Sequence, residues 1–352
     1  MKNKKANITL LSAADIKNGG FIASVRRGLN ELRSLKRRKI ISAPLPPMPE
    51  RIKLSVIICT LGKSHILCDS LKAVLNQTAA ADSYEVICVL NGNAAEPDKL
   101  PHGVRYITEP RCGLSYARNT GAAAAKGEIL LYIDDDAVAD SKLIESITGS
   151  FMLHKNTAVI GGQIYLDVPV PRPKILLSGR EGLWTSYTVP YKAYREVHEQ
   201  YSFPYGACFA IRKNALDELG SFPLSYGRVG ENYAGGEETA LCFMALKRGW
   251  KVGIEPSAIV THRVAPERFC RRHVKNTIKS GIFTTYRLIK DGYANYTWDA
   301  RYLSERVKIC NIELEKLKRD GKRIEYFYKK CESDAFAELL KKEAENEAYK
   351  SI

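Results

Sequence analysis

The sequence predicts an α/β fold built on a mostly parallel β-sheet with helices on both faces. Three apolar runs rich in strand-forming residues support it: LSVIIC (54–59), YEVICVL (84–90) and ILLYI (129–133). Helix-like segments around residues 66–77 and 115–126 separate these runs. Continuous apolar strands that alternate with helices are typical of a parallel sheet that is buried on both faces.

The composition changes twice along the chain and predicts three regions. Residues 51–265 form the predicted α/β domain, in which AVIGG (158–162) adds a strand and WKVGIEPSAIVTH (250–262) adds two short ones. Residues 266–352 are basic and rich in Lys and Glu, which predicts a helical C-terminal region. Residues 1–50 form a basic N-terminal extension. The expected architecture is therefore one sheet domain with helical N- and C-terminal extensions.

The N-terminal extension carries eleven Lys and Arg against three Asp and Glu. Within it, FIASVRRGLNELRSLKRRK has apolar residues at helical spacing and basic residues elsewhere on the helix, and the proline-rich SAPLPPMPE (42–50) follows as a linker. A basic amphipathic helix can lie in an anionic membrane interface or pack on the neighbouring domain with its basic face in solvent. Helical periodicity is compatible with both arrangements.

The net charge of +15 favours an anionic partner such as a membrane surface or a phosphorylated substrate. The charge is concentrated in the flanking regions and no nucleic-acid-binding motif occurs, so nucleic acid is not the expected partner. No apolar run approaches the ~20 residues of a membrane-spanning helix, and the N-terminus does not resemble a signal peptide. We therefore expect a cytoplasmic protein, or one docked on the cytoplasmic face of a membrane.

Three adjacent aspartates, Asp134, Asp135 and Asp136, directly follow the apolar run ILLYI. Neighbouring carboxylates repel one another unless a cation lies among them or solvent surrounds them. In an open parallel sheet, ligands bind beyond the carboxyl ends of the strands. Carboxylate oxygens are the ligands that Mg²⁺ and Mn²⁺ prefer, so this position favours a metal site over a solvated surface loop.

The acidic triplet belongs to an ordered set of motifs. The set consists of VIICTLGK (56–63), GLSYARN (113–119), DDD (134–136), GGEETAL (235–241) and AIVTHRV (258–264). Together these segments resemble the family-2 glycosyltransferases with the GT-A fold, over about residues 52–275. The resemblance implies a GT-A-like, Rossmann-related sheet, a nucleotide-sugar donor and a Mn or Mg divalent cation.

The resemblance also implies roles for individual residues. It assigns donor binding to Thr60, Asn91, Arg118, Asp134 and Asp135, metal binding to Asp136, Asp134 and His262, and catalysis to Glu238 as the base with Glu237 in support. The chain departs from the family pattern at two places. Leu90 and Asn91 stand where the family commonly has an acidic residue that reads the base, and Glu238 replaces the usual Asp.

Each assignment has a structural alternative. Glu237 and Glu238 are also the acids expected in the first turn of a helix, and a histidine after a strand is more often a packed residue. Arg118 is equally compatible with a solvated helix charge. Trp184 and the tyrosines of TSYTVPYKAY (185–194) suit either a sugar or a hydrophobic core.

Two further segments, one rich in glycine and one basic, each allow two interpretations. The loop SYGRVGENYAGGEE (225–238) resembles a mobile lid over the donor or an ordinary surface loop. The basic segment from Arg263 to Lys279 could attract the diphosphate of a lipid-linked acceptor or an anionic membrane, or form a solvated helix face.

The function that the sequence predicts is inverting, metal-dependent transfer of a sugar from a nucleotide-sugar donor, with a UDP-sugar favoured. The acceptor is a saccharide or a lipid-linked molecule, in the synthesis of a cell-surface polysaccharide or glycolipid. A catalytically inactive nucleotide-sugar-binding relative and a nucleotidyltransferase are the alternatives. The first-strand loop TLGKSH has a single glycine and a single lysine, which is weak support for a nucleotidyltransferase phosphate loop.

Overall fold

A computed structural model describes residues 54–64, 66–94, 101–228 and 235–350. The described chain divides into two compact units, one that ends at Trp298 and one that begins at Asp299. The predicted N-terminal amphipathic helix and proline-rich linker lie outside the described residues. The domain limits predicted at residues 50 and 265 stay predictions.

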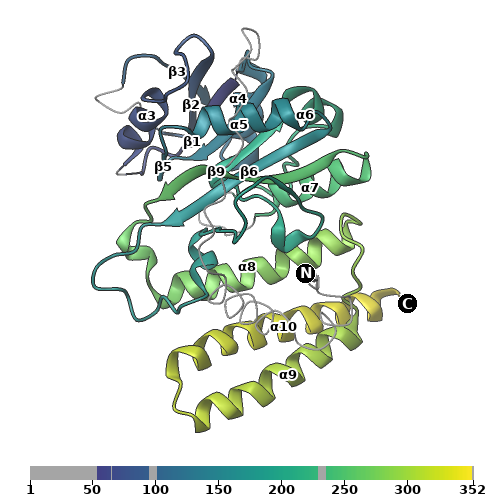
Figure 1. Cartoon of the computed structure of the whole chain (residues 1–352). Coiled ribbons are helices and arrows are strands. Elements are labelled where there is room, and N and C mark those ends of the chain that lie inside the picture. The colour runs from purple at the N-terminus through teal and green to yellow at the C-terminus, as the bar shows by residue number, and fades with distance from the viewer. Residues whose placement is uncertain (1–53, 65, 95–100, 229–234, 351–352) are drawn as a thin grey trace, which may run out of the picture. The chain divides into compact units, whose positions relative to one another are not determined.

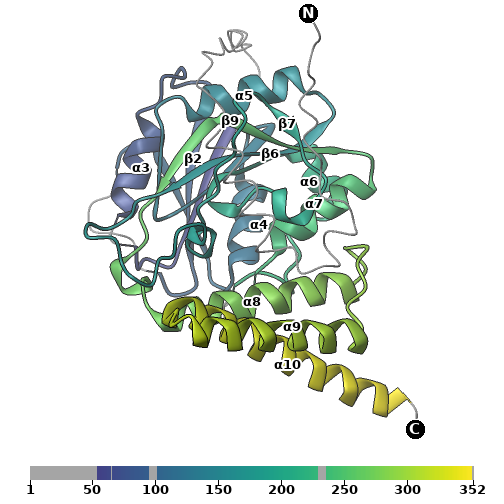
Figure 2. The same cartoon turned by 60° about the horizontal axis from the view of Figure 1, so that its bottom comes forward.

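The first unit is built on a mixed nine-stranded sheet (Figures 1 and 2). Its strands are β1 (Leu54–Thr60), β2 (Tyr84–Asn91), β3 (Val104–Glu109), β4 (Ile129–Asp134), β5 (Ala137–Ala139), β6 (Thr157–Leu166), β7 (Arg195–Glu196), β8 (Phe209–Arg212) and β9 (Lys251–His262). The strand order is β3-β2-β1-β4-β8-β6-β9-β5, with β7 paired to β9. The predicted parallel pairing is present from β3 to β4 and between β6 and β9, whereas β8 runs antiparallel to both of its neighbours.

Helices cover both faces of this sheet (Figure 1). They are α3 (Leu67–Leu75), α4 (Leu114–Ala124), α5 (Leu143–Leu153), α6 (Lys213–Leu219) and α7 (Glu237–Lys247). Helix α8 (Arg271–Lys290) lies below the sheet in Figure 1 and contacts the short helix Glu181–Trp184. Alternate residues of β1 enter different cores: Val56 and Ile58 pack with residues of α3 and α5, and Ile57 packs with residues of α4, α6 and α7. Burial on both faces explains why the strands are continuously apolar, and it confirms the predicted α/β class.

The segment 250–262 differs from its prediction of two short strands, because β9 is one strand of 12 residues. The register between β6 and β9 shifts where Gly161 and Gln163 oppose Ile254 and Ile259. The shift accommodates Pro256, whose carbonyl oxygen accepts a hydrogen bond from the side chain of Gln163 (2.8 Å). One continuous strand thus carries the chain from the far side of the sheet to His262.

Helix α4 lies unusually close to the sheet, which explains its run of small residues. A Cβ atom added at Gly121 would lie 2.5 Å from Cγ2 of Ile57 and 3.2 Å from Cγ2 of Val89. Both neighbours are fully buried and cannot move outward. This close approach sets the depth at which α4 presents Arg118 to the carboxyl end of β4.

The loop from β3 into α4 is fastened by two polar residues. The Asn91 side-chain amide donates to the carbonyl oxygens of Glu109 (3.2 Å) and Arg111 (2.7 Å), and its oxygen accepts from the backbone N–H of Gly113 (3.0 Å). The buried Glu109 carboxylate accepts from the backbone N–H of Arg111 (2.9 Å) and from the hydroxyl of Thr120 (2.5 Å). Hydrogen bonds from Arg111 lower the pKa of Glu109 to about 2 against the desolvation that burial causes.

The second unit contains the helices α9 (Ala300–Arg319) and α10 (Arg323–Lys350), which lie side by side (Figures 1 and 2). Asp299 caps α9 by accepting a hydrogen bond from the backbone N–H of Tyr302 (2.8 Å). The buried ammonium of Lys329 pairs with the carboxylates of Glu313 and Glu332. Among the described residues, no helix combines the length and the apolar composition that a membrane crossing requires.

We predict that Gly121→Ala lowers the free energy of unfolding by about 1–3 kcal/mol, since the new methyl group overlaps Ile57. The matched control is Gly281→Ala in α8, where the added methyl meets no atom within 4 Å. Helix propensity alone should leave that variant as stable as the wild type or more stable by up to about 1 kcal/mol. Urea unfolding of both variants measures the difference, and equal stability of the two would contradict the close packing of α4.

We also predict that Glu109→Gln destabilises the protein at neutral pH by about 1 kcal/mol. The expected loss is small because Arg111 is mostly exposed and solvent screens its attraction for Glu109. The folded-state pKa of Glu109 lies below its ordinary value, so its contribution is present above about pH 4.5 and is lost as the pH falls toward 2. Urea unfolding at pH 7 and at pH 3 should therefore show a smaller difference between wild type and variant at pH 3. A difference that grows on acidification would contradict this assignment.

Candidate active site

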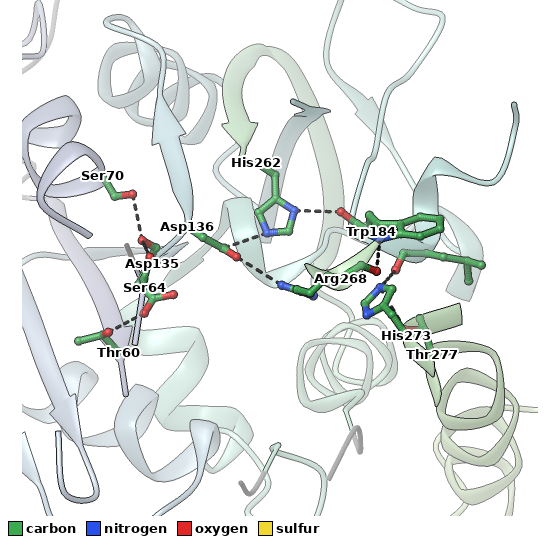
Figure 3. Close-up of polar contacts among 11 residues, drawn as sticks. Thr60, Ser64, Ser70, Asp135, Asp136, Trp184, His262, Arg268, His273 and Thr277 are labelled. Atoms are coloured by element: carbon green, nitrogen blue, oxygen red, sulfur yellow. Dashed lines mark hydrogen bonds and ion pairs between the residues drawn. The ribbon is translucent and has the colours of Figure 1, made fainter. Parts of the chain in front are cut away.

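The acidic loop begins where β4 ends, at the carboxyl edge of the parallel part of the sheet. The hydroxyl of Thr60, the last residue of β1, donates to the carboxylate of Asp135 (2.5 Å). The hydroxyls of Ser64 and Ser70 donate to the backbone carbonyl of Asp135 (2.9 and 3.1 Å; Figure 3). These contacts to one residue from β1, from the loop after it and from α3 hold the acidic loop in a single conformation. Burial, together with the neighbouring aspartates, raises the pKa of Asp135 to about 7.

Strand pairing brings a distant histidine to this loop. In the antiparallel pair of β5 and β9, Ala137 lies opposite His262, so the residue before β5 lies beside the histidine at the end of β9. The ligand atoms of Asp134, Asp136 and His262 all lie within 4.8 Å of one another. Two carboxylate oxygens and an imidazole nitrogen form a donor set that suits Mn²⁺ or Mg²⁺, with oxygen ligands in the majority.

The His262 ring is oriented by hydrogen bonds at both nitrogens (Figure 3). Nδ1 lies 2.9 Å from the backbone carbonyl oxygen of Trp184, so Nδ1 carries a proton and donates it. Nε2 lies 2.9 Å from Oδ1 of Asp136. A backbone acceptor at Nδ1 leaves Nε2 as the nitrogen that can bind a metal, which is the usual arrangement behind a histidine ligand.

Asp136 and His262 shift each other's pKa. Burial by itself would lower the pKa of His262, but the hydrogen bond and charge of Asp136 outweigh burial and raise it. Burial would likewise raise the pKa of Asp136, and the contact with His262 lowers it instead. Asp134 behaves differently, because burial and the charge of Asp136 raise its pKa. The metal-free cluster therefore favours an Asp136–His262 ion pair.

A tryptophan and an arginine complete this side of the site (Figure 3). Trp184, in a short helix over Glu181–Trp184, is fully buried, and its indole N–H donates to the carbonyl oxygen of Arg268 (3.0 Å). The guanidinium of Arg268 lies 3.3 Å from Oδ2 of Asp136. Trp184 therefore belongs to the core, as one of the two sequence interpretations held. Its role beside His262 carried no sequence signal, because it acts through a backbone carbonyl.

Arg118 is a buried cation between the acidic loop and α7. Its Nη1 donates to Glu237 (2.8 Å) and to Glu238 (2.7 Å), and its Nη2 lies 3.8 Å from Asp134. The Arg118 side chain is 3% exposed, so the interpretation as a solvated helix charge is wrong. A Cβ atom at Gly206 would lie 2.1 Å from Glu238 and 2.2 Å from Arg118, so the glycine backbone completes the enclosure of this pair.

The two glutamates begin α7 but differ in access to solvent. The side chain of Glu237 is 2% exposed and that of Glu238 is 16% exposed. Burial, followed by the neighbouring charge of Glu238, raises the pKa of Glu237 to about 7 even though Arg118 opposes the shift. Glu238 is therefore the more accessible of the two carboxylates to a substrate.

The structure thus gathers eight of the nine residues expected from the sequence at one edge of the sheet or in direct contact with it. The exception is Asn91, at the end of β2, whose amide is occupied in fastening the loop before α4. Its predicted role in reading the nucleotide base stays a prediction. Residues 229–234 of the expected lid lie outside the described residues. Sequence reasoning missed Ser64 and Ser70, because isolated serines in a loop and a helix carry no distinctive pattern.

Comparisons with known proteins agree with this architecture. Residues 55–220 match the family model described as glycosyl transferase family 2. The chain is 23% identical over 223 residues to the glucosyl-dolichyl phosphate glucuronosyltransferase of Haloferax volcanii, covering 60% of this chain and 70% of that protein. It is 24% identical over 224 residues to the minor teichoic acid biosynthesis protein GgaB of Bacillus subtilis, covering 60% of this chain and 23% of that protein.

A solved structure is similar in fold. It is a mannosyltransferase, PcManGT, from Pyrobaculum calidifontis in complex with GDP-Man and Mn²⁺, with a TM-score of 0.53 and 17% sequence identity. The similarity covers 79% of this chain and 74% of that protein. The matched segment, the curated relatives and the GT-A-like sheet together show that the chain is a glycosyltransferase with a family 2 domain over residues 55–220.

Proposed function

We propose that this protein is an inverting, metal-dependent glycosyltransferase that moves a sugar from a nucleotide-sugar donor to a hydroxyl of a saccharide or lipid-linked acceptor. One observation carries the proposal. At the carboxyl edge of the sheet, Asp134 belongs to a cluster of metal-ligating residues and also lies beside Arg118, which holds the carboxylates of α7. A donor site and a base therefore lie within reach of one sugar.

Asp134, Asp136 and His262 would hold a Mn²⁺ or Mg²⁺ ion. When bound, such an ion supplies Lewis-acid stabilisation of the charge that develops on the departing nucleoside diphosphate. Thr60 and Asp135 lie at the adjoining strand ends, where hydroxyl groups of the ribose or sugar could bind. The complex of the Pyrobaculum mannosyltransferase with GDP-Man and Mn²⁺ supports a nucleotide sugar and a divalent cation as ligands of this fold.

Glu238 is the proposed base. The acceptor hydroxyl must lose its proton as it attacks, and a positioned carboxylate can take that proton in the transition state. Arg118 keeps Glu238 in its place through a hydrogen bond, while Glu237 contacts the same guanidinium and stays buried. A single displacement on the face opposite the diphosphate inverts the anomeric centre.

The acceptor class is proposed from two relatives. One is named for transfer to a glucosyl-dolichyl phosphate and the other for teichoic acid biosynthesis, so a lipid-linked or surface-polymer acceptor is consistent with both names. The basic helix α8 could approach the anionic surface that carries such an acceptor. We propose a peripheral location on the cytoplasmic face of a membrane, and high salt should release the protein from membranes in that case.

We predict that a nucleotide sugar raises the melting temperature only when Mn²⁺ or Mg²⁺ is present, because a ligand that binds the folded state stabilises it by mass action. The screen compares UDP-, GDP- and dTDP-sugars with and without the ion, and a UDP-sugar is the expected ligand. Asp136→Asn should remove the shift. If no nucleotide sugar shifts the melting temperature under any condition, the chain binds no donor and the proposed function is wrong.

With the donor found in that screen, Glu238→Gln should lower the rate of nucleoside diphosphate release by about 10²–10⁴-fold, the usual contribution of a positioned base. Donor binding should be retained, since the variant keeps the shape of the side chain. The matched control is Glu237→Gln, which changes the other partner of Arg118 and should reduce turnover less. A larger loss in the Glu237 variant, at equal folding, would transfer the role of base to Glu237.

A further inference from the structure

Both carboxylate oxygens of Asp136 already have partners in the protein. Oδ1 lies 2.9 Å from Nε2 of His262, and Oδ2 lies 3.3 Å from Nη1 of Arg268. A metal ion held by Asp136 must take at least one of these oxygens. Because His262 belongs to the same cluster of metal-ligating residues and would bind the same ion, Arg268 is the partner whose attraction to Asp136 the ion weakens.

Trp184 holds the backbone carbonyl of Arg268, while the Arg268 guanidinium reaches toward Asp136 (Figure 3). The indole N–H of Trp184 binds the Arg268 carbonyl oxygen, and the Trp184 ring stacks on Phe269 at 5.4 Å between ring centroids with a 15° tilt. The Arg268 side chain is 30% exposed. Its guanidinium can therefore leave Asp136 without disturbing Trp184, whose own carbonyl orients His262.

We infer that Arg268 is an exchangeable counter-ion that holds Asp136 in the absence of a metal ion and turns to the diphosphate of the nucleotide once the ion is bound. The inference rests on the proposed function. It adds Arg268 to the donor site as a residue that exchanges Asp136 for the diphosphate. It makes Arg268 a binding residue for the donor and, before donor binding, a competitor of the metal ion.

Charge explains why the exchange should occur. Asp134 and Asp136 would repel each other without a cation between them, so a nearby guanidinium stabilises the empty site. A divalent ion neutralises Asp136 and releases the guanidinium. A diphosphate that reaches the same ion brings new phosphate oxygens beside Arg268, and a guanidinium can bind two of them at once.

The exchange makes metal and nucleotide binding cooperative. A metal ion that binds alone neutralises Asp136 and so leaves the Arg268 guanidinium beside a second cation with a weakened anionic partner. A nucleoside diphosphate supplies that anion, so each ligand strengthens the binding of the other by the same factor.

The experiment is a calorimetric titration of the full chain with Mn²⁺, alone and in saturating UDP or GDP. Arg268→Gln should bind Mn²⁺ alone about two- to fivefold more tightly than the wild type, the range expected on removal of a half-exposed ion pair. The tightening of Mn²⁺ binding by the nucleotide should shrink in the same variant. Arg268→Lys keeps the charge and loses the planar fork, so it should lie between wild type and Arg268→Gln.

Arg263→Gln is the matched control. The guanidinium of Arg263 pairs with Asp69 (3.4 Å) and Asp167 (3.8 Å), and only its backbone N–H contacts Asp136 (2.8 Å). This variant removes one positive charge near the site and keeps the side-chain contacts of Asp136. It should leave both Mn²⁺ affinities unchanged.

The outcomes separate the inference from the proposed function. Suppose Mn²⁺ binds the wild type and requires Asp136, while Arg268→Gln binds the ion equally or more weakly. The inference is then wrong and the metal site stands. If Arg263→Gln and Arg268→Gln raise the affinity for Mn²⁺ equally, the effect comes from the loss of any positive charge near the site. That result would also overturn the inference. If Mn²⁺ binds none of the variants, with or without nucleotide, both the inference and the metal-dependent function fail.

Discussion

Carboxylates from two distant parts of the chain, the acidic loop after β4 and the start of α7, converge at one edge of the sheet, and their charge must be balanced before they can be buried there. Arg118 provides much of this balance, because its guanidinium lies between Asp134 and the two glutamates of α7. Removing one partner from such a buried pair leaves an uncompensated charge, which is strongly unfavourable. The packing of α4 on the sheet through Gly121 therefore matters, since it sets how far Arg118 reaches toward these carboxylates.

Asp134 connects two charged networks. On one side lie Arg118 and the proposed base Glu238, and on the other lie Asp136, His262 and Arg268. Binding of a cation by Asp134 would weaken its attraction for Arg118 and leave the guanidinium more fully with the glutamates. The proposed donor side and the proposed acceptor side are thus joined through a single strand end. That arrangement suits a reaction in which the leaving diphosphate and the attacking hydroxyl act on opposite faces of one sugar.

Most of the site residues could be found from the sequence because they follow strands or begin a helix. Asp134–Asp136 follow an apolar run, His262 ends another, and Glu237 and Glu238 come after paired glycines. These positions share one edge of a parallel sheet whatever the loops between them do. Asn91 also ends a strand, yet its amide is used to fasten the loop before α4. A strand end places a side chain, but the neighbouring loop decides which partners that side chain meets.

The α/β class, the family resemblance and the strand ends that carry the acidic and histidine residues can all be predicted from the sequence, because they depend on local periodicity and on residue order. Three contacts become visible in the folded chain alone: Trp184 orients His262, Arg268 pairs with Asp136, and Arg118 is buried between two glutamates. These contacts join residues that are 78 to 132 positions apart in the chain. Packing and charge balance in three dimensions determine which residues make these contacts, and neither leaves a periodic signal along the chain.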